Sequence, residues 1–436
     1  MPIVFASCIS DSSVINNLDS ELHEVIAQNS YVGGEESLIL PESHELELIP
    51  QDPKNPLTAQ KVELGQLLFH ETALGTNAKM KEGMGTFSCA SCHHAAAGFQ
   101  AGVAQGIGDG GLGFGIRGEA RFANENYNLK DLDVQPLRSP TVLNSAYQEL
   151  MLWNGQFGAT GLNEGTEAFW TDNTPKAVNK LGYQGVETQA IAGLDVHRML
   201  VDEDFVNANQ QYKDLFDVAF SDVPQENRYN NEIAGLAIAA YERTVLANQS
   251  PFQNWLKNRS NSLTSGELRG AIVFFGKGEC AECHSGPALS SMTFHALGMR
   301  DLDATQSFVH GLDENVRKGR GGFTENATDN YKFKTPQLYS IQDSPHFGHG
   351  ASFKSIDQVI RYKNRGVKEN ANVPQEYISS SFKSLDLTES EIQDLTQFIR
   401  TGLYDNNLQR YTPSSVLSGQ CIPNNDGMSQ NDLGCS

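Results

Sequence analysis

Basic side chains and long apolar stretches are both scarce in this 436-residue chain. It has 32 Lys and Arg residues against 53 Asp and Glu residues, which gives a formal net charge of −21 at pH 7. This excess of negative charge argues against nucleic acid or an anionic membrane surface as a partner and favours a basic one, although acidity alone also keeps a protein soluble. No run of 18 or more apolar residues occurs, so the sequence predicts no membrane-spanning helix.

The alternation of apolar and polar residues that is typical of strands is also scarce, whereas helical patterns recur. Residues 58–70 place leucines on one face, and residues 231–247 are rich in Ala, Ile and Leu. Residues 249–251 (Gln-Ser-Pro) interrupt the helical pattern. Thr264 and Thr388 each stand three residues before a Glu, the arrangement of a capping box that starts a helix. The sequence therefore predicts a mainly α-helical protein with long loops.

Two copies of the pentapeptide C-x-x-C-H carry the strongest chemical signal. Their reactive residues are Cys89, Cys92 and His93 in the first copy, and Cys280, Cys283 and His284 in the second. C-x-x-C-H is the attachment signal of c-type haem, in which the thiols bind the porphyrin vinyl groups and the histidine ligates iron. A zinc site made from both thiol pairs would not need the histidines, and a redox dithiol would lack them. Two covalently bound haem c groups are the favoured interpretation, with zinc and a plain dithiol as alternatives.

Three further cysteines, Cys8, Cys421 and Cys435, complete the total of seven. Cys421 and Cys435 enclose a short C-terminal loop and are predicted to form a disulfide, which indicates an oxidising compartment. Attachment of haem c also takes place outside the cytoplasmic membrane in bacteria, so we expect a periplasmic protein. Residues 2–8 are similar to the end of a lipoprotein signal, so Cys8 is either a lipid anchor or an unpaired thiol.

The sequence divides into four predicted parts. Residues 1–54 are acidic and are expected to form an extended arm, and residues 55–248 form a first cytochrome c-like domain. Residues 249–410 form a second such domain, and residues 411–436 form a disulfide-closed tail. The tail is rich in Asn and Asp, whose oxygens could hold calcium, but its spacing fits no EF-hand, and a polar loop is favoured.

The order of further motifs resembles the bacterial diheme cytochrome c peroxidase family, which includes the MauG-type enzymes. The matching stretches are residues 64–69, 139–144, 152–155, 241–244, 274–287 and 333–336. The resemblance implies two tandem cytochrome c-like domains with His93 and His284 as proximal iron ligands. It implies that the first haem is peroxidatic with an open iron face, and that the second is six-coordinate and stores or relays electrons.

The resemblance also implies an activity and partners. A periplasmic peroxidase would reduce hydrogen peroxide with electrons from a small donor protein, a cytochrome c or a cupredoxin, and homodimers are common in the family. Some relatives close the resting iron with a histidine that follows the first motif, but residues 95–140 contain none. MauG-like oxidation of a protein or small molecule is one alternative, weakened because Gly278 and Glu279 stand where MauG-type enzymes have a surface Trp. A non-enzymatic diheme electron carrier is the other.

Three residues are candidates for the catalytic machinery. Gln189 falls where the family places its distal Gln, but the usual Glu is not evident in residues 192–199. His197, in that stretch, titrates near neutral pH and is the candidate acid–base residue, with Arg198 as an alternative stabiliser of charge. His197 could instead be a packed histidine. Trp153 matches the Trp between the two haems, where an indole shortens the gap for electron transfer, although a buried Trp is often only part of a core.

Two metal positions depart from the family pattern. Arg138 stands where the family has an Asn that binds a bridging calcium, which puts calcium in doubt, although carbonyls near residues 335–336 could still contribute. An ungapped alignment places Lys363 at the distal position of the second haem. A lysine amine ligates iron only after losing its proton. Tyr362 and Met299 are the alternatives, and Lys363 could also face solvent.

Overall fold

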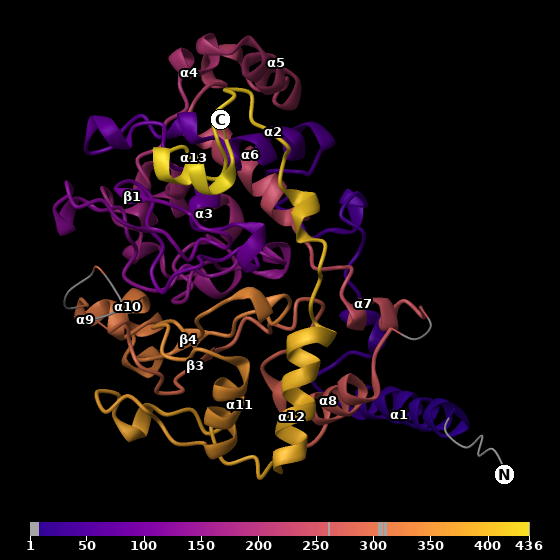
Figure 1. The fold of residues 1–436 in the computed structure, drawn as a ribbon. Helices are drawn as coiled ribbons and strands as arrows, with labels where there is room; N and C mark the ends of the chain where they lie inside the picture. The colour runs from indigo at the N-terminus through magenta and orange to yellow at the C-terminus, as the bar shows by residue number, and fades with distance from the viewer. Residues whose placement is uncertain (1–7, 260–261, 304–307, 309–311, 436) are drawn as a thin grey trace.

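The computed structural model describes residues 8–435 except 260–261, 304–307 and 309–311, with side chains from residue 14 onward, and it is mainly helical (Figure 1). The α-helices of the first part are α1 (Cys8–Gln28), α2 (Ala59–His70), α3 (Gly185–Val196), α4 (Glu203–Ala208), α5 (Gln210–Ala219), α6 (Asn231–Thr244) and α7 (Pro251–Leu256). Those that follow are α8 (Ser265–Phe275), α9 (Glu314–Arg317), α10 (Arg320–Thr324), α11 (Ile356–Arg365), α12 (Glu389–Gln397), which continues as a π-helical turn (Phe398–Gly402), and α13 (Gly427–Leu433). The strands of the described residues are β1 (Gly111–Leu112), β2 (Phe122–Ala123), β3 (Phe294–His295) and β4 (Phe333–Lys334).

Two helical groups lie one above the other in Figure 1. In the first half, α2 and α3 both pack against α6, and in the second half α8 packs against α12. β1 pairs with β2 and β3 pairs with β4, each antiparallel, so each sheet consists of two short strands that join loop segments. The prediction of a mainly α-helical fold is confirmed. Among the described residues, no helix combines the length and apolarity needed to span a bilayer.

Glycines allow the helices of each half to approach closely. A Cβ at Gly65 in α2 would lie 1.9 Å from the carbonyl oxygen of Ala237 in α6. A Cβ at Gly235 in α6 would lie 2.6 Å from the Cα of Ile191 in α3. Any larger side chain would force these backbones apart. The position of α3, which carries two candidate catalytic residues, is therefore fixed by backbone contact with α6.

Helix starts follow the predicted capping residues. The Thr58 side chain accepts a hydrogen bond from the backbone amide of Lys61, and α2 begins at the next residue, Ala59. Thr264 and Thr388 both form the predicted capping boxes, at the starts of α8 and α12. These side chains satisfy amides that the first helical turn leaves without partners.

The expectation of an extended N-terminal arm is wrong for residues 8–28. They form α1, a helix of 21 residues that packs against α8 of the second half. Leu22 and Ile26, one turn apart, are completely buried, so an apolar stripe lies among the acidic and polar residues of α1. At the end of the stripe, Trp255 Nε1 donates a 2.5 Å hydrogen bond to Asp19.

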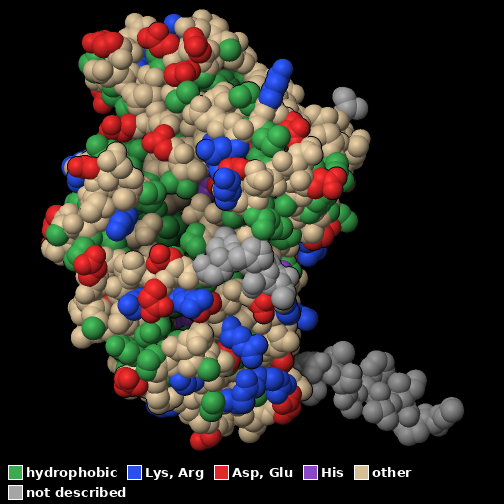
Figure 2. All heavy atoms as spheres, turned by 90° about the vertical axis from the view of Figure 1, so that its left-hand side faces the viewer, with side chains coloured by type: hydrophobic (Ala, Val, Ile, Leu, Met, Phe, Trp, Pro, Cys, Tyr) green, Lys and Arg blue, Asp and Glu red, His purple; other side chains and the backbone are tan. Residues whose placement is uncertain are grey.

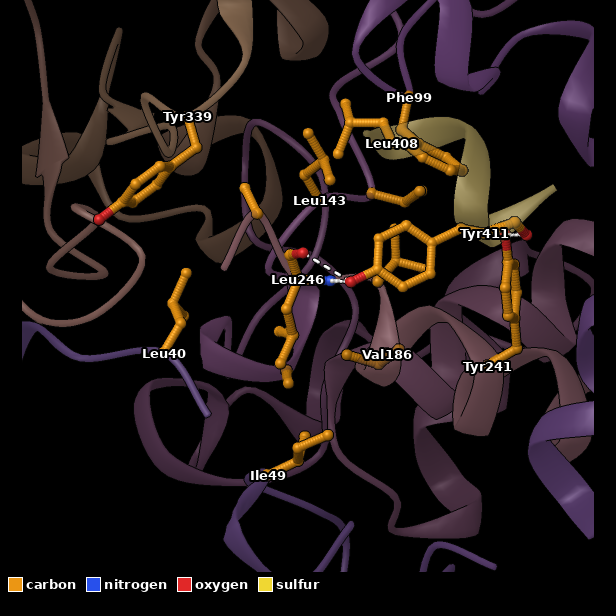
Figure 3. Packing of buried hydrophobic residues seen from close by; sticks show 14 of the residues in the cluster. Leu40, Ile49, Phe99, Leu143, Val186, Tyr241, Leu246, Tyr339, Leu408 and Tyr411 are labelled. Carbon is orange, nitrogen blue, oxygen red and sulfur yellow. Dashed lines mark hydrogen bonds between the residues drawn. The ribbon is translucent and has the colours of Figure 1, made fainter. Parts of the chain in front are cut away.

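The C-terminal tail leaves the second half and returns to the first (Figure 1). Tyr411 begins this return, and its hydroxyl bonds to both the amide and the carbonyl of Leu246, at 3.1 and 2.6 Å (Figure 3). Further along, Ser88, which directly precedes the first haem motif, donates to the carbonyl of Pro423 at 2.9 Å. The tail thus stabilises the loop that carries the first haem motif.

The predicted disulfide between Cys421 and Cys435 is confirmed. It closes a loop whose polar side chains are used in contacts within the protein. Asp426 accepts from the amides of Gly113 and Ser429. Asp432 accepts from the backbone amides of Phe114 and Gly115, at 2.9 and 2.8 Å.

Removal of the disulfide by the double substitution Cys421→Ser and Cys435→Ser should lower the free energy of unfolding by about 3 kcal/mol, the usual effect of a closed loop of about 15 residues. Urea unfolding followed by tryptophan fluorescence measures this loss. Val218→Ser, at a side chain that is 61% exposed, is the control and should leave the midpoint unchanged. An unchanged midpoint in the double variant would show that the tail is held by its other contacts alone.

Candidate haem sites

The two C-x-x-C-H motifs adopt the same local structure. In each, the first three residues form one 3₁₀ turn, Cys89–Ser91 in the first motif and Cys280–Glu282 in the second. The amide of His93 then donates to the carbonyl of its first cysteine at 3.1 Å, and the amide of His284 does the same at 2.9 Å. Both thiols and the histidine of each motif therefore come from a single tight turn, as covalent attachment of a haem requires.

A backbone carbonyl orients each histidine. His93 Nδ1 lies 3.4 Å from the carbonyl oxygen of Phe99, and His284 Nδ1 lies 3.0 Å from that of Leu289. Because a carbonyl only accepts, Nδ1 carries the hydrogen, and Nε2 keeps its lone pair for a metal. Phe99 and Leu289 both adopt positive φ values, 56° and 48°. This repeated arrangement could not be predicted from the sequence, since neither Phe nor Leu is typical of a positive φ.

Burial keeps these groups neutral. Burial, the largest cause, lowers the pKa of His93 to about 4 and that of His284 to about 3. Burial also raises the pKa of Cys92 and Cys280 to about 12. Neutral imidazole is the form that ligates iron. Among the described residues no group of three or more His, Cys, Asp or Glu side chains is arranged around one metal ion, so the thiol pairs do not converge on a zinc site. The donor set fits two c-type haems.

A cavity of about 270 Å³ adjoins the second motif. Lys363 and Met299, two of the candidate distal ligands, line this cavity together with His284. Burial lowers the pKa of Lys363, although the nearby thiols Cys280 and Cys283 act in the opposite direction. The structure therefore directs Lys363 into the cavity and not into solvent, and its burial eases the loss of the proton that ligation of iron requires.

Tyr362, the third candidate, points away from the cavity. Its hydroxyl donates to the carbonyl of Leu297 at 2.5 Å, and its ring packs between Phe353 and Phe382, with centroids 5.0 Å away in each case. On helix α11, neighbouring residues face directions about 100° apart, so only one of Tyr362 and Lys363 can face the cavity. The choice of distal ligand narrows to Lys363 and Met299, and Lys363 remains the prediction.

Two of the candidate catalytic residues lie on α3 or directly after it. Gln189 lies within α3, and His197 is the residue that caps its C-terminal end, eight residues later. Gln189 Oε1 is buried and has no hydrogen-bond partner within the described part of the chain. The charge of His197 reaches His93, whose pKa it helps to lower. The structure thus brings His197 toward the first haem ligand, and Gln189 stands two turns earlier on the helix that leads to His197.

Asp133 holds His197 in place and was not predicted. His197 Nδ1 donates to both carboxylate oxygens of Asp133, at 2.9 and 3.0 Å. Burial lowers the pKa of His197, but the charge and hydrogen bond of Asp133 more than offset it, so the pKa is raised. Arg198, the alternative charge stabiliser, is tied instead to Asp109 at 2.5 Å and to the carbonyl of Asp131 at 2.6 Å. His197 is therefore the better acid–base candidate of the two.

Trp153 is fixed by backbone contacts from both halves. Its Nε1 donates to the carbonyl of Arg138 at 2.8 Å, and its own carbonyl accepts from the amide of Lys334 at 2.7 Å. The ring lines the cavity that adjoins the second motif, and it packs edge-on against His349, with centroids 6.3 Å apart. Trp153 stands at the junction of the halves, a position that suits the predicted role between the haems.

Comparisons with known proteins agree with these features. The family model for di-haem cytochrome c peroxidase matches residues 59–261. The chain is 29% identical over 373 residues to the cytochrome-c peroxidase IdrP1 of Pseudomonas sp. (strain SCT), which covers 80% of this chain and 83% of that protein. It is 26% identical over 359 residues to the methylamine utilization protein MauG of Methylorubrum extorquens, 81% of each chain.

The solved structures also include similar folds. A MauG-like protein associated with microbial copper homeostasis aligns with a TM-score of 0.57 and 22% identity, over 85% of this chain and 95% of that chain. At this level of identity the similarity establishes the fold alone. The shared feature is therefore the mainly helical fold.

Substitution of the predicted distal ligand tests the second site. Lys363→Ala should remove the ligand and convert the second haem from low spin to high spin, as followed by optical and EPR spectra of the diferric protein. Tyr362→Phe is the matched control on the neighbouring residue and should leave the spectrum unchanged. A low-spin spectrum that survives Lys363→Ala but is lost in Met299→Ala would assign the ligand to Met299.

Substitution of Asp133 tests the state of His197. A reaction that needs the imidazolium is fast below its pKa and slows as pH rises through that pKa. Asp133→Asn removes the charge that raises the pKa, so the alkaline decline in the rate with peroxide should move to lower pH. Asp195→Asn, at an exposed acid on the same helix, is the control and should leave the profile unchanged. A decline that stays in place in Asp133→Asn would show that His197 does not control it.

Proposed function

We propose that this chain, which is similar to cytochrome-c peroxidases over most of its length, reduces hydrogen peroxide at the haem held by His93, with electrons relayed from the haem held by His284. Peroxide reduction to two waters consumes two electrons and two protons. When bound, haem supplies an iron that coordinates peroxide and exchanges electrons. The approach of His197 to His93, whose pKa it helps to lower, is the observation that carries this proposal.

The residues of the chain have separate tasks in this reaction. Because Asp133 holds Nδ1 of His197, the other ring nitrogen is left to pass a proton to the leaving oxygen of peroxide. Gln189 presents a buried carbonyl oxygen with no partner, which can accept a hydrogen bond from peroxide and orient it. The family's usual distal Glu is missing here, so the pair of His197 and Asp133 takes over its acid–base task.

Electrons would enter through the second half. Trp153 is held rigidly at the junction, so its indole can shorten the path between the haems. The net charge of −21 suits a small basic donor, a cytochrome c or a cupredoxin. Figure 2 shows that charge is unevenly spread on the face it presents, with acidic side chains gathered toward the α4 and α5 end and Lys and Arg side chains toward the other.

The periplasm is the proposed compartment. The disulfide between Cys421 and Cys435 supports an oxidising environment. The side chain of Cys8, the proposed lipid anchor, lies outside the described side chains.

A MauG-like oxidation of a bound protein is less well supported. At Gly278, one of the two residues that replace the surface Trp, an added Cβ would lie 2.7 Å from the carbonyl of Val273, so the backbone leaves no room for a side chain there. Glu279, the other, pairs with Lys383 at 2.9 Å. The route that MauG-type enzymes use for hole transfer to a protein has no counterpart at these positions.

Steady-state turnover of hydrogen peroxide with a reduced cytochrome c tests the proposal. His197→Asn should lower the rate by roughly 10²- to 10⁴-fold, the usual contribution of general acid–base catalysis. His44→Asn, at an exposed histidine elsewhere, is the matched control and should retain full activity. Azide or cyanide should change the spin state of the first haem. A protein with two haems that neither turns over peroxide nor binds these ligands would instead be an electron carrier.

A further inference from the structure

Two tripeptides related by an internal repeat lie near the two haem ligands. Residues 138–140 read Arg-Ser-Pro and residues 334–336 read Lys-Thr-Pro. The backbone at Pro140 lies within hydrogen-bond reach of the His93 ring, and that at Pro336 within reach of the His284 ring. A cation therefore occupies the same position relative to the proximal histidine in each half.

Both cations are buried and reach across to the opposite half. Arg138 is 2% exposed and Lys334 is 6% exposed. Arg138 donates to Ser344 Oγ in the second half at 2.9 Å. Lys334 Nζ donates to the carbonyl of Leu150 in the first half at 2.8 Å, and also to Gln148 Oε1. These contacts between the halves meet at Trp153. Its Nε1 donates to the backbone carbonyl of Arg138, and its carbonyl accepts from the backbone amide of Lys334.

Neither cation has an anion to balance it. Arg138 and Lys334 form no ion pair with any carboxylate of the described residues, and every acceptor they use is neutral. Arg138 Nε is buried without a partner among the described residues, and the three hydrogen bonds of the guanidinium use three of its five N–H donors, which leaves two unused. Burial is the only cause that lowers the pKa of Arg138, to about 10, and that of Lys334, to about 7. A buried charge without a partner is strongly unfavourable, so these two side chains are suited to bind an anion.

The chemistry of the cavity identifies that anion. Arg138 and Lys334 both line the cavity that adjoins His284. A haem carries two propionate carboxylates, and a guanidinium binds a carboxylate through paired N–H donors. A divalent cation would be repelled by two fixed positive charges, so this arrangement opposes calcium at the same place.

We propose that Arg138 and Lys334 bind haem propionates and supply, from the chain itself, the positive charge between the two haems. This inference rests on the two haems of the proposed function but not on peroxide as the substrate. Binding both cations to haem carboxylates would hold Trp153 in a fixed position between the halves. Because positive charge next to a propionate opposes the ferric state, these residues would also raise the reduction potential of the second haem.

Spectroelectrochemical titration of the holoprotein tests this inference. Arg138→Gln and Lys334→Gln should each shift the midpoint potential of the second haem to lower values, because each leaves a propionate without its counter-charge. Arg138→Lys retains the charge and should restore most of the wild-type potential. Arg259→Gln removes a cation at an exposed position and is the matched control, with no shift expected. Haem content, measured as the pyridine haemochrome, ensures that each variant carries two haems.

Chelation tests whether the positive charge comes from the two side chains or from a bound metal ion. Treatment of the wild type with EDTA should leave both midpoint potentials and the tryptophan fluorescence unchanged. Potentials that are unchanged in both glutamine variants, or that fall after EDTA treatment of the wild type, would overturn the inference. If the glutamine variants show these shifts but the wild type does not turn over peroxide, the proposed activity is refuted and the inference stands.

Discussion

The hydrogen bond from each proximal histidine to a backbone carbonyl is the contact on which the account depends. It fixes His93 Nδ1 toward Phe99 and His284 Nδ1 toward Leu289, so that Nε2 of each ring is available to iron. Burial of the two rings then holds them neutral. Without this orientation the cysteines could still attach a porphyrin, but its iron would lack a defined fifth ligand.

The surrounding helices and loops place different chemistry at the two sites. At the first, the C-terminal end of α3 brings the imidazole of His197 toward His93, and Asp133 stabilises the charged form of that imidazole. At the second, α11 directs the amine of Lys363 into the cavity. One site therefore has groups suited to proton transfer to a small ligand, and the other has a group suited to closing the iron. This difference is the basis for dividing the reaction between the halves.

Much of the fold followed from local sequence signals. The haem motifs, the capping threonines and the C-terminal disulfide each depend on a few neighbouring residues, so their geometry could be predicted directly. α1 was missed because its apolar stripe, Leu22 and Ile26, is short and lies within an acidic segment. The partner of His197 was missed because Asp133 lies 64 residues earlier in the sequence, and only the tertiary fold brings the two together. The common position of Arg138 and Lys334 on one cavity was missed because these two residues are also far apart in the sequence.

The EPR spectrum of the resting diferric protein, at a haem content of two per chain, tests the central claim most directly, because it reports the ligands of both irons at once. We expect one high-spin signal from the haem of His93, whose other face we propose to be open, and one low-spin signal from the haem of His284. Two low-spin signals in every redox state would contradict an open peroxidatic site. A protein without haem, after expression in a host that matures c-type cytochromes, would contradict the entire account.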